Sequence, residues 1–242
     1  MKEKVIENKK QSNICDDLNY ESREAYNLLR TNISFAFPDT VGGKVIGVCS
    51  SCPQEGKSTT SINLTYSLAE AGNKVLLIDA DMRRPSVYTT LEIPMEPGLS
   101  EALSGNENIK VQHGVHHENM DVLSSGHIPP NPSELIGSQR MATFLDGCKE
   151  KYDYIIVDLP PVLSVSDPVA VSKYLDGMII VVRHGKTRRR DIVETIRQLE
   201  YVGVKILGFV YNRIGAKSGK DSKKHYYYGD YHSKNKKGTN KK

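Results

Sequence analysis

A glycine, a lysine and a serine stand together at Gly56-Lys57-Ser58, after a loop-like segment and an apolar run. In the pattern GxxxxGK[ST], loop amides cradle phosphate groups at a helix N-terminus, the lysine reaches the β- and γ-phosphate oxygens, and the hydroxyl binds Mg²⁺. Ser51 takes the place of the first glycine, so the motif is a variant. The sequence predicts a nucleotide phosphate site formed by Ser51, Cys52, Pro53, Gln54, Glu55, Gly56, Lys57, Ser58 and Thr59.

Carboxylates follow two further apolar runs. Asp79 and Asp81 come after residues 75–78, and Asp158 comes after residues 154–157. Ligands of open α/β sheets gather at the carboxyl ends of strands, and Mg²⁺ prefers oxygen ligands. A helix cap plus a surface acid is the alternative interpretation of Asp79 and Asp81. Together with the lysine, these acids indicate a metal–triphosphate site whose candidate magnesium ligands are Ser58, Asp79, Asp81 and Asp158.

The surrounding pattern predicts the elements that would position these side chains. Apolar runs of strand length, several of them nearly continuous Val, Ile and Leu, recur at 44–49, 74–79, 121–124, 153–158, 177–183 and 205–211. Helix-period patterns occupy 58–71, 133–148 and 188–201, and a further one covers 13–37. The alternation predicts an α/β fold with right-handed βαβ units: a P-loop NTPase whose mostly parallel β-sheet is flanked by helices.

Three parts are expected along the chain: an N-terminal helical segment at 1–43, a P-loop core at 44–214, and a disordered Lys- and Tyr-rich tail at 215–242. Residues 217–242 hold nine lysines and two aspartates, whereas residues 1–216 hold 24 basic and 27 acidic side chains. The core therefore has an ordinary solvated surface rather than a nucleic-acid footprint.

The sequence has no apolar run long enough for a membrane span and no signal-peptide core, so we expect a cytoplasmic protein.

Two other groups of residues could suggest metal chemistry. Cys49 and Cys52 form a CxxC, but no second pair or histidine stands at zinc spacing, and both lie at the phosphate segment. His113, His116 and His117 stand in a polar segment without a partner group. We expect reduced thiols and no metal site in either place.

The phosphate segment and the two acidic segments together resemble the Walker A, Walker A′ and Walker B motifs of the bacterial tyrosine kinases, the BY-kinase family of capsule and exopolysaccharide synthesis. The resemblance covers nearly the whole chain, and the tyrosine-rich end is its most specific feature. It extends to Glu24-x-x-Asn27-x-x-Arg30, Asn131-Pro-Ser-Glu-Leu-Ile, Tyr211-Asn212-Arg213, and the tail residues Tyr226, Tyr227, Tyr228 and Tyr231.

This resemblance implies an ATP- and Mg²⁺-dependent protein-tyrosine kinase that autophosphorylates the tail tyrosines and regulates capsular or exopolysaccharide synthesis and export. It places Lys57, Asp79 and Asp81 in the catalytic site, Arg83 at the nucleotide and Asn212 against adenine. Either Asp79 or Asp81 could accept the proton of the acceptor phenol, and Asp81 is favoured. The resemblance also implies a separate Wzz-like transmembrane polysaccharide co-polymerase whose cytosolic tail activates the kinase and recruits it to the inner face of the membrane.

One departure concerns subunit assembly. The family's ExxRxxR oligomerisation pattern has Asn27 in place of its first arginine, although the spacing of three still aligns Glu24, Asn27 and Arg30 on one helical face. A homo-oligomer, with a ring as one form, is expected. Two alternatives stay open: a partition or septum-positioning ATPase, whose second loop lysine is replaced here by Cys52, and a catalytically idle nucleotide-binding scaffold for glycan enzymes.

Overall fold

The computed structural model describes residues 14–38, 42–106 and 109–213. In these residues a six-stranded sheet has the strand order β3-β2-β4-β1-β5-β6, and all neighbouring strands are parallel. Its strands are β1 (Lys44–Ser50), β2 (Val75–Asp79), β3 (Met120–Leu123), β4 (Tyr154–Asp158), β5 (Gly177–Arg183) and β6 (Ile206–Asn212). The expected parallel sheet is confirmed, and each strand begins and ends within one residue of the apolar run that predicted it.

Side chains of the central strands alternate between two apolar cores, one on each face of the sheet. Ile46 and Val48 of β1 belong to one core, and Val45 and Cys49 of the same strand belong to the other. All four are fully buried. A parallel strand that is covered on both faces needs apolar side chains at nearly every position, which explains the continuous apolar runs.

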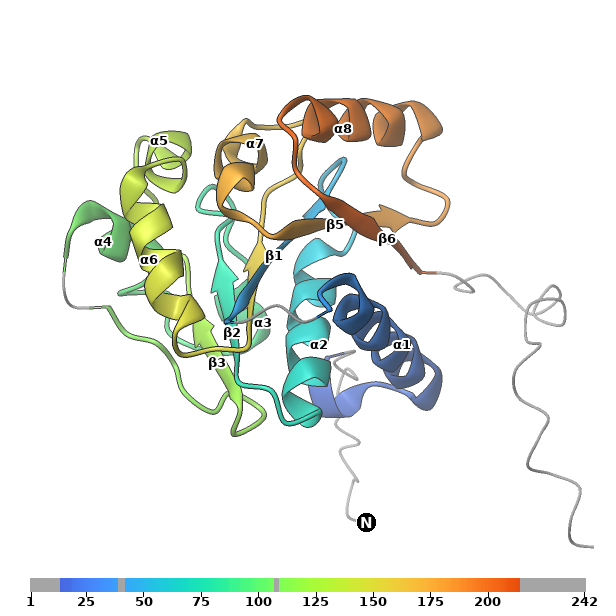
Figure 1. Cartoon of the computed structure of the whole chain (residues 1–242), viewed down its shortest axis with the longest axis horizontal. Coiled ribbons are helices and arrows are strands. Elements are labelled where there is room, and N and C mark those ends of the chain that lie inside the picture. The colour runs from blue at the N-terminus through green and yellow to red at the C-terminus, as the bar shows by residue number, and fades with distance from the viewer. Residues whose placement is uncertain (1–13, 39–41, 107–108, 214–242) are drawn as a thin grey trace, which may run out of the picture. The chain divides into compact units, whose positions relative to one another are not determined.

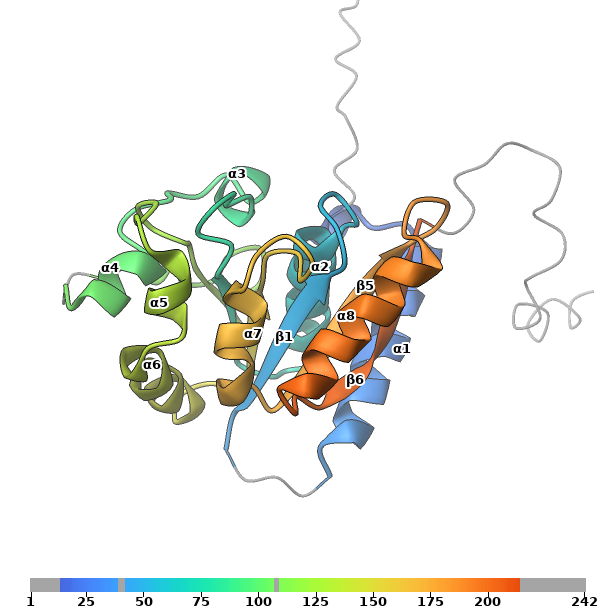
Figure 2. The same ribbon diagram turned by 90° about the horizontal axis from the view of Figure 1, so that it is seen from above.

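Helices cover both faces of the sheet (Figures 1 and 2). Helices α1 (Tyr20–Ala36), α2 (Lys57–Glu70) and α3 (Val87–Thr90) contribute to the first core. The second core receives side chains from α4 (Leu99–Ser104), α5 (Pro132–Ile136), α6 (Gln139–Lys149), α7 (Asp167–Val171) and α8 (Arg189–Tyr201). Short 3₁₀ helices, Cys15–Asp17 and Ser172–Tyr174, precede α1 and follow α7. Figure 1 shows α1 beside α2, the helix that begins at Lys57.

The pattern at 133–148 predicted one helix, but the chain forms α5 and α6, separated by Gly137 and Ser138. The single-helix prediction was wrong because Ser138 has an extended backbone and its Oγ accepts a hydrogen bond from the N–H of Met141. A serine in that conformation caps a new helix rather than continuing an old one.

The N-terminal helix is shorter than expected. The pattern at 13–37 predicted a helix over its whole length, but α1 begins at Tyr20. Asn19 caps it, because its side chain accepts a hydrogen bond from the N–H of Ser22 at 2.8 Å. Side-chain capping explains this late start.

The chain divides into two units, Met1–Asn212 and Arg213–Lys242. Helix α1 and the sheet both belong to the first unit. The second unit lies outside the described residues except for Arg213, and so do the tail tyrosines expected as phosphoacceptors. None of the helices in 14–38, 42–106 and 109–213 is long and apolar enough to span a bilayer.

Candidate active site

The phosphate loop, residues 51–58, joins the carboxyl end of β1 to the start of α2. Gly56 is the N-cap of α2, and its φ of 98° lies in the left-handed region that favours glycine. A side chain here would also collide with Asn212, because an added Cβ would lie 1.9 Å from its Nδ2. The loop therefore brings Lys57 and Ser58 to a helix N-terminus, where backbone N–H groups attract anions.

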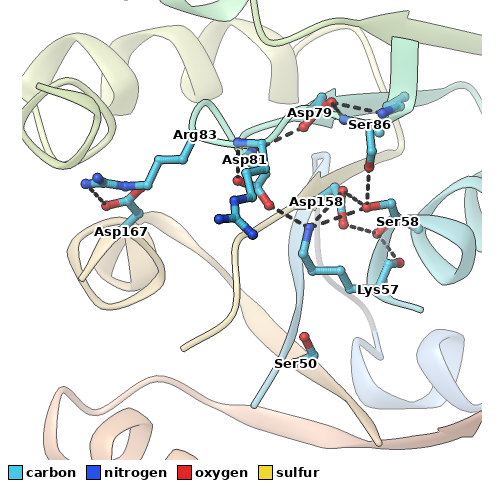
Figure 3. A network of polar contacts seen from close by, with 12 residues as sticks. Ser50, Lys57, Ser58, Asp79, Asp81, Arg83, Ser86, Asp158 and Asp167 are labelled. Atoms are coloured by element: carbon cyan, nitrogen blue, oxygen red, sulfur yellow. Dashed lines mark hydrogen bonds and ion pairs between the residues drawn. The ribbon is translucent and has the colours of Figure 1, made fainter. Parts of the chain in front are cut away.

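Lys57 is held between two carboxylates (Figure 3). Its Nζ lies 2.8 Å from Oδ2 of Asp81 and 3.6 Å from Oδ2 of Asp158, and the residue is 9% exposed. Burial lowers the pKa of Lys57, but the carboxylates of Asp158 and Asp81 outweigh burial and raise the pKa above its usual value. Lys57 is therefore a charged ammonium group at the edge of the sheet where β1, β2 and β4 end.

Ser58 is oriented by the acid at the end of β4. Its Oγ donates a hydrogen bond of 2.6 Å to Oδ2 of Asp158, whose Oδ1 accepts one of 3.0 Å from Ser61. Burial raises the pKa of Asp158, while Lys57 and the two serine hydroxyls oppose the rise. The hydroxyl of Ser86 donates to Ser58 Oγ at 3.0 Å, so Ser58 is fixed from two sides (Figure 3).

Asp79 is turned toward the backbone of the segment that follows β2. Its Oδ1 accepts a hydrogen bond from the N–H of Asp81 at 3.2 Å, and its Oδ2 accepts from the N–H groups of Ser86 and Val87 at 3.2 and 3.1 Å. The side chain is fully buried beside Asp158, its partner in the β2–β4 register. Burial and the Asp158 carboxylate raise the pKa of Asp79 to about 7. Asp79 thus organises the turn between β2 and α3.

Asp81 presents its carboxylate to Lys57. Its Oδ1 accepts a hydrogen bond from the N–H of Arg84 at 3.1 Å, and its Oδ2 pairs with the lysine. The residue is 4% exposed, whereas Asp79 is 0% exposed. Of the two acids that the sequence offered as proton acceptors, Asp81 is the one that faces the lysine expected to meet phosphate.

Of the four side chains expected as Mg²⁺ ligands, Ser58 and Asp158 are hydrogen-bonded to each other, whereas Asp81 pairs with Lys57 and Asp79 accepts backbone N–H groups. Mg²⁺ commonly keeps several waters and adds one or two protein oxygens and substrate phosphates. A serine hydroxyl directed by a buried carboxylate fits such a shell. Within the described residues, no group of three or more His, Cys, Asp or Glu side chains could hold a metal ion, so phosphate oxygens and water would have to complete the shell.

Arg83 lies apart from the Lys57 group (Figure 3). Its Nε and Nη2 donate to the two carboxylate oxygens of Asp167 at 3.0 and 3.1 Å, and Nη2 also donates to Ser133 Oγ at 3.0 Å. The hydrogen bonds to Asp167 raise the pKa of Arg83. Instead of joining the phosphate-binding residues, Arg83 connects the segment after β2 to the starts of α5 and α7.

Other residues brace the phosphate loop. The buried Glu55 carboxylate accepts hydrogen bonds from the N–H of Cys52 at 3.0 Å and from Thr187 Oγ1 at 2.5 Å. Asn212, expected against adenine, donates from Nδ2 to the carbonyl oxygen of Glu55 at 3.0 Å. The structure therefore brings Asn212 to the loop. Of the remaining predicted residues, Ser51 is buried and Pro53, Gln54 and Thr59 are exposed.

The cysteines and histidines that could suggest metal chemistry lie in different surroundings. Cys49 is buried in the second core, and burial raises the pKa of its thiol. Cys52 is half-buried in the phosphate loop. His113 Nδ1 lies 2.8 Å from Oδ2 of Asp121, and His117 packs edge-on against Tyr66.

Several residues around the site were missed by sequence reasoning. Ser61 could have been found, because it lies one helical turn after Lys57 and Ser58 and faces the same side of α2. Ser86 and Asp167 could not be found from local spacing, since Ser86 contacts Ser58 and Asp167 contacts Arg83 only in the folded chain. Arg183, the last residue of β5, and Lys186, in the connection to α8, also gave no such signal.

The parallel sheet, the phosphate loop at the end of β1 and the acids at the ends of β2 and β4 define a P-loop nucleotide-binding protein. In agreement, a family model described as an AAA domain matches residues 43–202. A solved structure of the septum site-determining protein MinD from Pyrococcus horikoshii, complexed with Mg-ADP, is 24% identical with a TM-score of 0.61 and covers 72% of each chain. That likeness shows the shared fold.

Closer similarity is found among kinases. Tyrosine-protein kinase YwqD of Bacillus subtilis (strain 168) is 38% identical over 212 residues, which cover 87% of this chain and 86% of the relative. The solved kinase domain of the Escherichia coli tyrosine kinase ETK is 33% identical with a TM-score of 0.79, covering 89% of this chain and 83% of that one. The chain belongs to the bacterial tyrosine-protein kinase family.

Some relatives are much longer than this chain. Tyrosine-protein kinase etk of Escherichia coli (strain K12) is 35% identical over 79% of this chain, but the match spans only 26% of that relative. Because the kinase relatives match at higher identity than MinD, the partition-type ATPase is not favoured. Because these relatives are named as kinases, the idle scaffold is not favoured either.

Proposed function

We propose that this chain transfers the γ-phosphoryl group of ATP to tyrosine hydroxyls, including tyrosines of its own C-terminal tail. The observation that supports this most directly is the position of Lys57, with one acid, Asp81, at its Nζ and another, Asp158, directing Ser58. A phosphate-binding cation, a metal-binding hydroxyl and a carboxylate that can face an acceptor are the parts that phosphoryl transfer needs.

The phosphate loop and Lys57 would hold the triphosphate. Phosphate oxygens compete with Asp81 for the lysine, so nucleotide binding releases that carboxylate. Ser58 and Asp158 would hold Mg²⁺, which neutralises charge on the β- and γ-phosphates when bound. The phenol oxygen then bonds to the γ-phosphorus as the bond to the β–γ bridging oxygen breaks, and ADP leaves.

Asp81 would accept the phenol proton. A tyrosine hydroxyl has a pKa of about 10, so a carboxylate is a weak base for it and takes the proton late, when the oxygen–phosphorus bond is well formed. Asp79 is a poorer candidate, because both of its oxygens accept backbone N–H groups. Its proposed role is to hold the Asp81 turn in place.

The family resemblance supports further proposals about context. Tyr226, Tyr227, Tyr228 and Tyr231 are the proposed acceptors, and other protein tyrosines are proposed substrates. The activator would be a separate Wzz-like transmembrane polysaccharide co-polymerase, which would recruit the chain to the inner face of the membrane. The regulated process would be capsular or exopolysaccharide synthesis and export. The proposed assembly is a homo-oligomer that uses the N-terminal segment.

The test incubates the purified chain with ATP and MgCl₂, with and without the cytosolic tail of a candidate co-polymerase. Mass spectrometry of tail peptides should find phosphotyrosine in the wild type and none in Lys57→Met. Free phosphate without phosphotyrosine in both incubations would support an ATPase instead. Nucleotide binding with neither product would support the idle scaffold.

A further inference from the structure

The backbone carbonyls of four consecutive phosphate-loop residues, 52–55, all accept hydrogen bonds from side chains. Three of the donors come from elements far along the chain, at the end of β5, in the β5–α8 connection and at the end of β6. The bonds run from Ser50 Oγ to Cys52 O (2.8 Å), from Lys186 Nζ to Pro53 O (2.7 Å), from Arg183 Nη1 to Gln54 O (2.8 Å) and from Asn212 Nδ2 to Glu55 O (3.0 Å).

These bonds determine where the loop amides point. A trans peptide is planar, and its C=O and N–H groups point in opposite directions. Fixing the carbonyls of residues 53, 54 and 55 toward Lys186, Arg183 and Asn212 therefore directs the N–H groups of residues 54, 55 and 56 away from those side chains. The N–H groups of such a loop are the ones that bind phosphate.

The backbone conformation of the loop agrees with this direction. Gln54 has a φ of 62° and Gly56 has a φ of 98°, and Glu55 between them is not in the left-handed region. Alternation between right- and left-handed residues gathers successive N–H groups into an anion-binding nest. A left-handed glutamine is uncommon and strained, so surrounding contacts must hold it. Arg183 binds its carbonyl, and Lys186 Nζ lies 3.4 Å from its Oε1.

Further bonds fix the donors and the entry of the loop. The N–H of Arg183 donates to Thr187 Oγ1 at 2.8 Å, and Thr187 Oγ1 donates to the Glu55 carboxylate. That carboxylate also accepts the N–H of Cys52, which lies outside the nest. The end of β5 and the β5–α8 connection thus contact the backbone carbonyls and the Glu55 carboxylate of the loop. These contacts leave the N–H groups of residues 54–56 to bind a ligand.

We propose that Arg183, Lys186 and Asn212 are positioning residues for the nucleotide, which hold the phosphate loop with its amides directed at the β-phosphate. The inference rests on the proposed binding of ATP. Two of the donors are cations, and a charged donor on the carbonyl polarises the peptide, so that its N–H becomes a stronger donor. None of the three needs to touch the nucleotide phosphates, which separates them from Lys57.

The test measures dissociation constants by calorimetry for Mg-ADP and for magnesium tripolyphosphate, at 50 mM and 500 mM KCl. The variants are Arg183→Met, Lys186→Met and Asn212→Leu, with Arg183→Lys as the conservative variant. Arg189→Met is the matched control, because it removes one exposed cation from the same region and no hydrogen bond joins Arg189 to the loop among the described residues. Melting temperatures without ligand check that each variant folds.

We expect each of the three variants to weaken binding of both ligands about tenfold at both salt concentrations, with Arg183→Lys and Arg189→Met close to wild type. High salt would reduce a loss of affinity that came from a direct attraction between a cation and the ligand, because salt screens charges. It would not reduce a loss that came from loop N–H groups pointing in the wrong direction. Losses that vanish at high salt, or that Arg189→Met reproduces, would overturn the proposal. If Asn212→Leu weakens binding of Mg-ADP but not of tripolyphosphate, then Asn212 contacts adenine rather than positioning the loop. A wild type that binds Mg-ADP yet forms no phosphotyrosine would remove the kinase proposal and leave this one standing.

Discussion

The Nζ of Lys57 lies 2.8 Å from Oδ2 of Asp81, so the proposed phosphate-binding cation is paired with the proposed proton acceptor. The lysine is buried and its pKa is raised by Asp158 and Asp81 against the effect of burial. Phosphate binding must therefore exchange one anionic partner of Lys57 for another. The pairing therefore predicts how the loss of Asp81 changes nucleotide affinity.

Asp81→Asn should leave Mg-ADP affinity unchanged or make it tighter, because Lys57 then has one competitor fewer. Phosphotyrosine formation should fall by at least about 100-fold, since general-base removal commonly has an effect of that size. Calorimetry and a single-turnover transfer assay measure the two quantities. Equal losses in affinity and in transfer would show that Asp81 serves ground-state binding.

Lys57→Met should abolish transfer and also lower the stability of the nucleotide-free protein. Removing the cation leaves the buried Asp81 and Asp158 without it, and breaking a buried pair costs about 3–5 kcal/mol. The melting temperature should fall by about 6–20 °C. The double variant Lys57→Met/Asp81→Asn should recover part of the loss, because it has one buried acid fewer. A double variant less stable than Lys57→Met would contradict this electrostatic account.

The parts of the site that the sequence predicted are those built from local pattern. Lys57 and Ser58 follow a buried strand, and Asp79 and Asp158 end two more, so parallel strands alone bring them to one edge of the sheet. The partner of Arg83 could not be predicted in this way, because Asp167 lies 84 residues away.

Two further features have physical reasons that the sequence pattern does not contain. The division between α5 and α6 depends on whether Ser138 caps or continues a helix, which helix periodicity does not decide. The family resemblance placed Asn212 against adenine, and that role stays a prediction. Its hydrogen bond to the Glu55 carbonyl depends on the left-handed turn at Gly56, which allows the close approach.

Asp167→Asn should destabilise the fold by about 1.5–3 kcal/mol, because it removes the charged partner of the Arg83 guanidinium. The acid is buried, so the same loss should follow from Arg83→Met, and the double variant should lose less than the sum of the two. Urea denaturation measures all three. Ser133→Ala is the comparison, since it removes the hydroxyl that contacts both Arg83 and Asp167 and keeps the ion pair between them. Strictly additive losses would show that the pair contributes no coupling.

Glu101 should stabilise the protein in a pH-dependent way. Burial tends to raise the pKa of Glu101, but the N–H groups of Gly98 and His127, which donate to its carboxylate at 2.7 and 2.9 Å, lower it overall. A carboxylate with a lowered folded-state pKa stabilises the fold above its unfolded pKa, and this stabilisation is lost as the pH falls through the folded-state value.

Glu101→Gln should therefore lower the melting temperature by about 2–4 °C at pH 7, the shift expected for about 1 kcal/mol of helix capping. The difference from wild type should shrink below pH 4. Glu92→Gln is a matched control on an exposed acid. A difference that stays constant from pH 7 to pH 3 would rule out the charge of Glu101 as its origin.

The exposed face of α1 should govern self-association, whereas Arg30 should govern the stability of the single chain. Tyr20, Leu28 and Phe35 are 78, 63 and 77% exposed, and at 100° per residue their spacing of eight and seven places them within an arc of about 80° on one side of the helix. Arg30, the residue that the family pattern assigns to the subunit contact, instead donates from Nη1 to the carbonyl and hydroxyl oxygens of Ser67 at 2.6 and 3.2 Å. Arg30 therefore joins α1 to α2 of the same chain by hydrogen bonds.

Phe35→Glu combined with Leu28→Glu should lower the mass measured by light scattering across a concentration series and leave the melting temperature of the dissociated chain within about 1 °C. Arg30→Met should lower that melting temperature by about 2–4 °C, because the Ser67 carbonyl loses a charged donor. If Arg30→Met dissociates the oligomer without lowering stability, then Arg30 leaves Ser67 on assembly and reaches a neighbouring subunit, as the family pattern implies. A wild type that is monomeric at every concentration would remove the oligomer proposal. Two results together would support an interface made by the outward apolar residues of α1. The Leu28→Glu/Phe35→Glu variant must lower the measured mass, and Arg30→Met must lower the melting temperature without dissociating the oligomer.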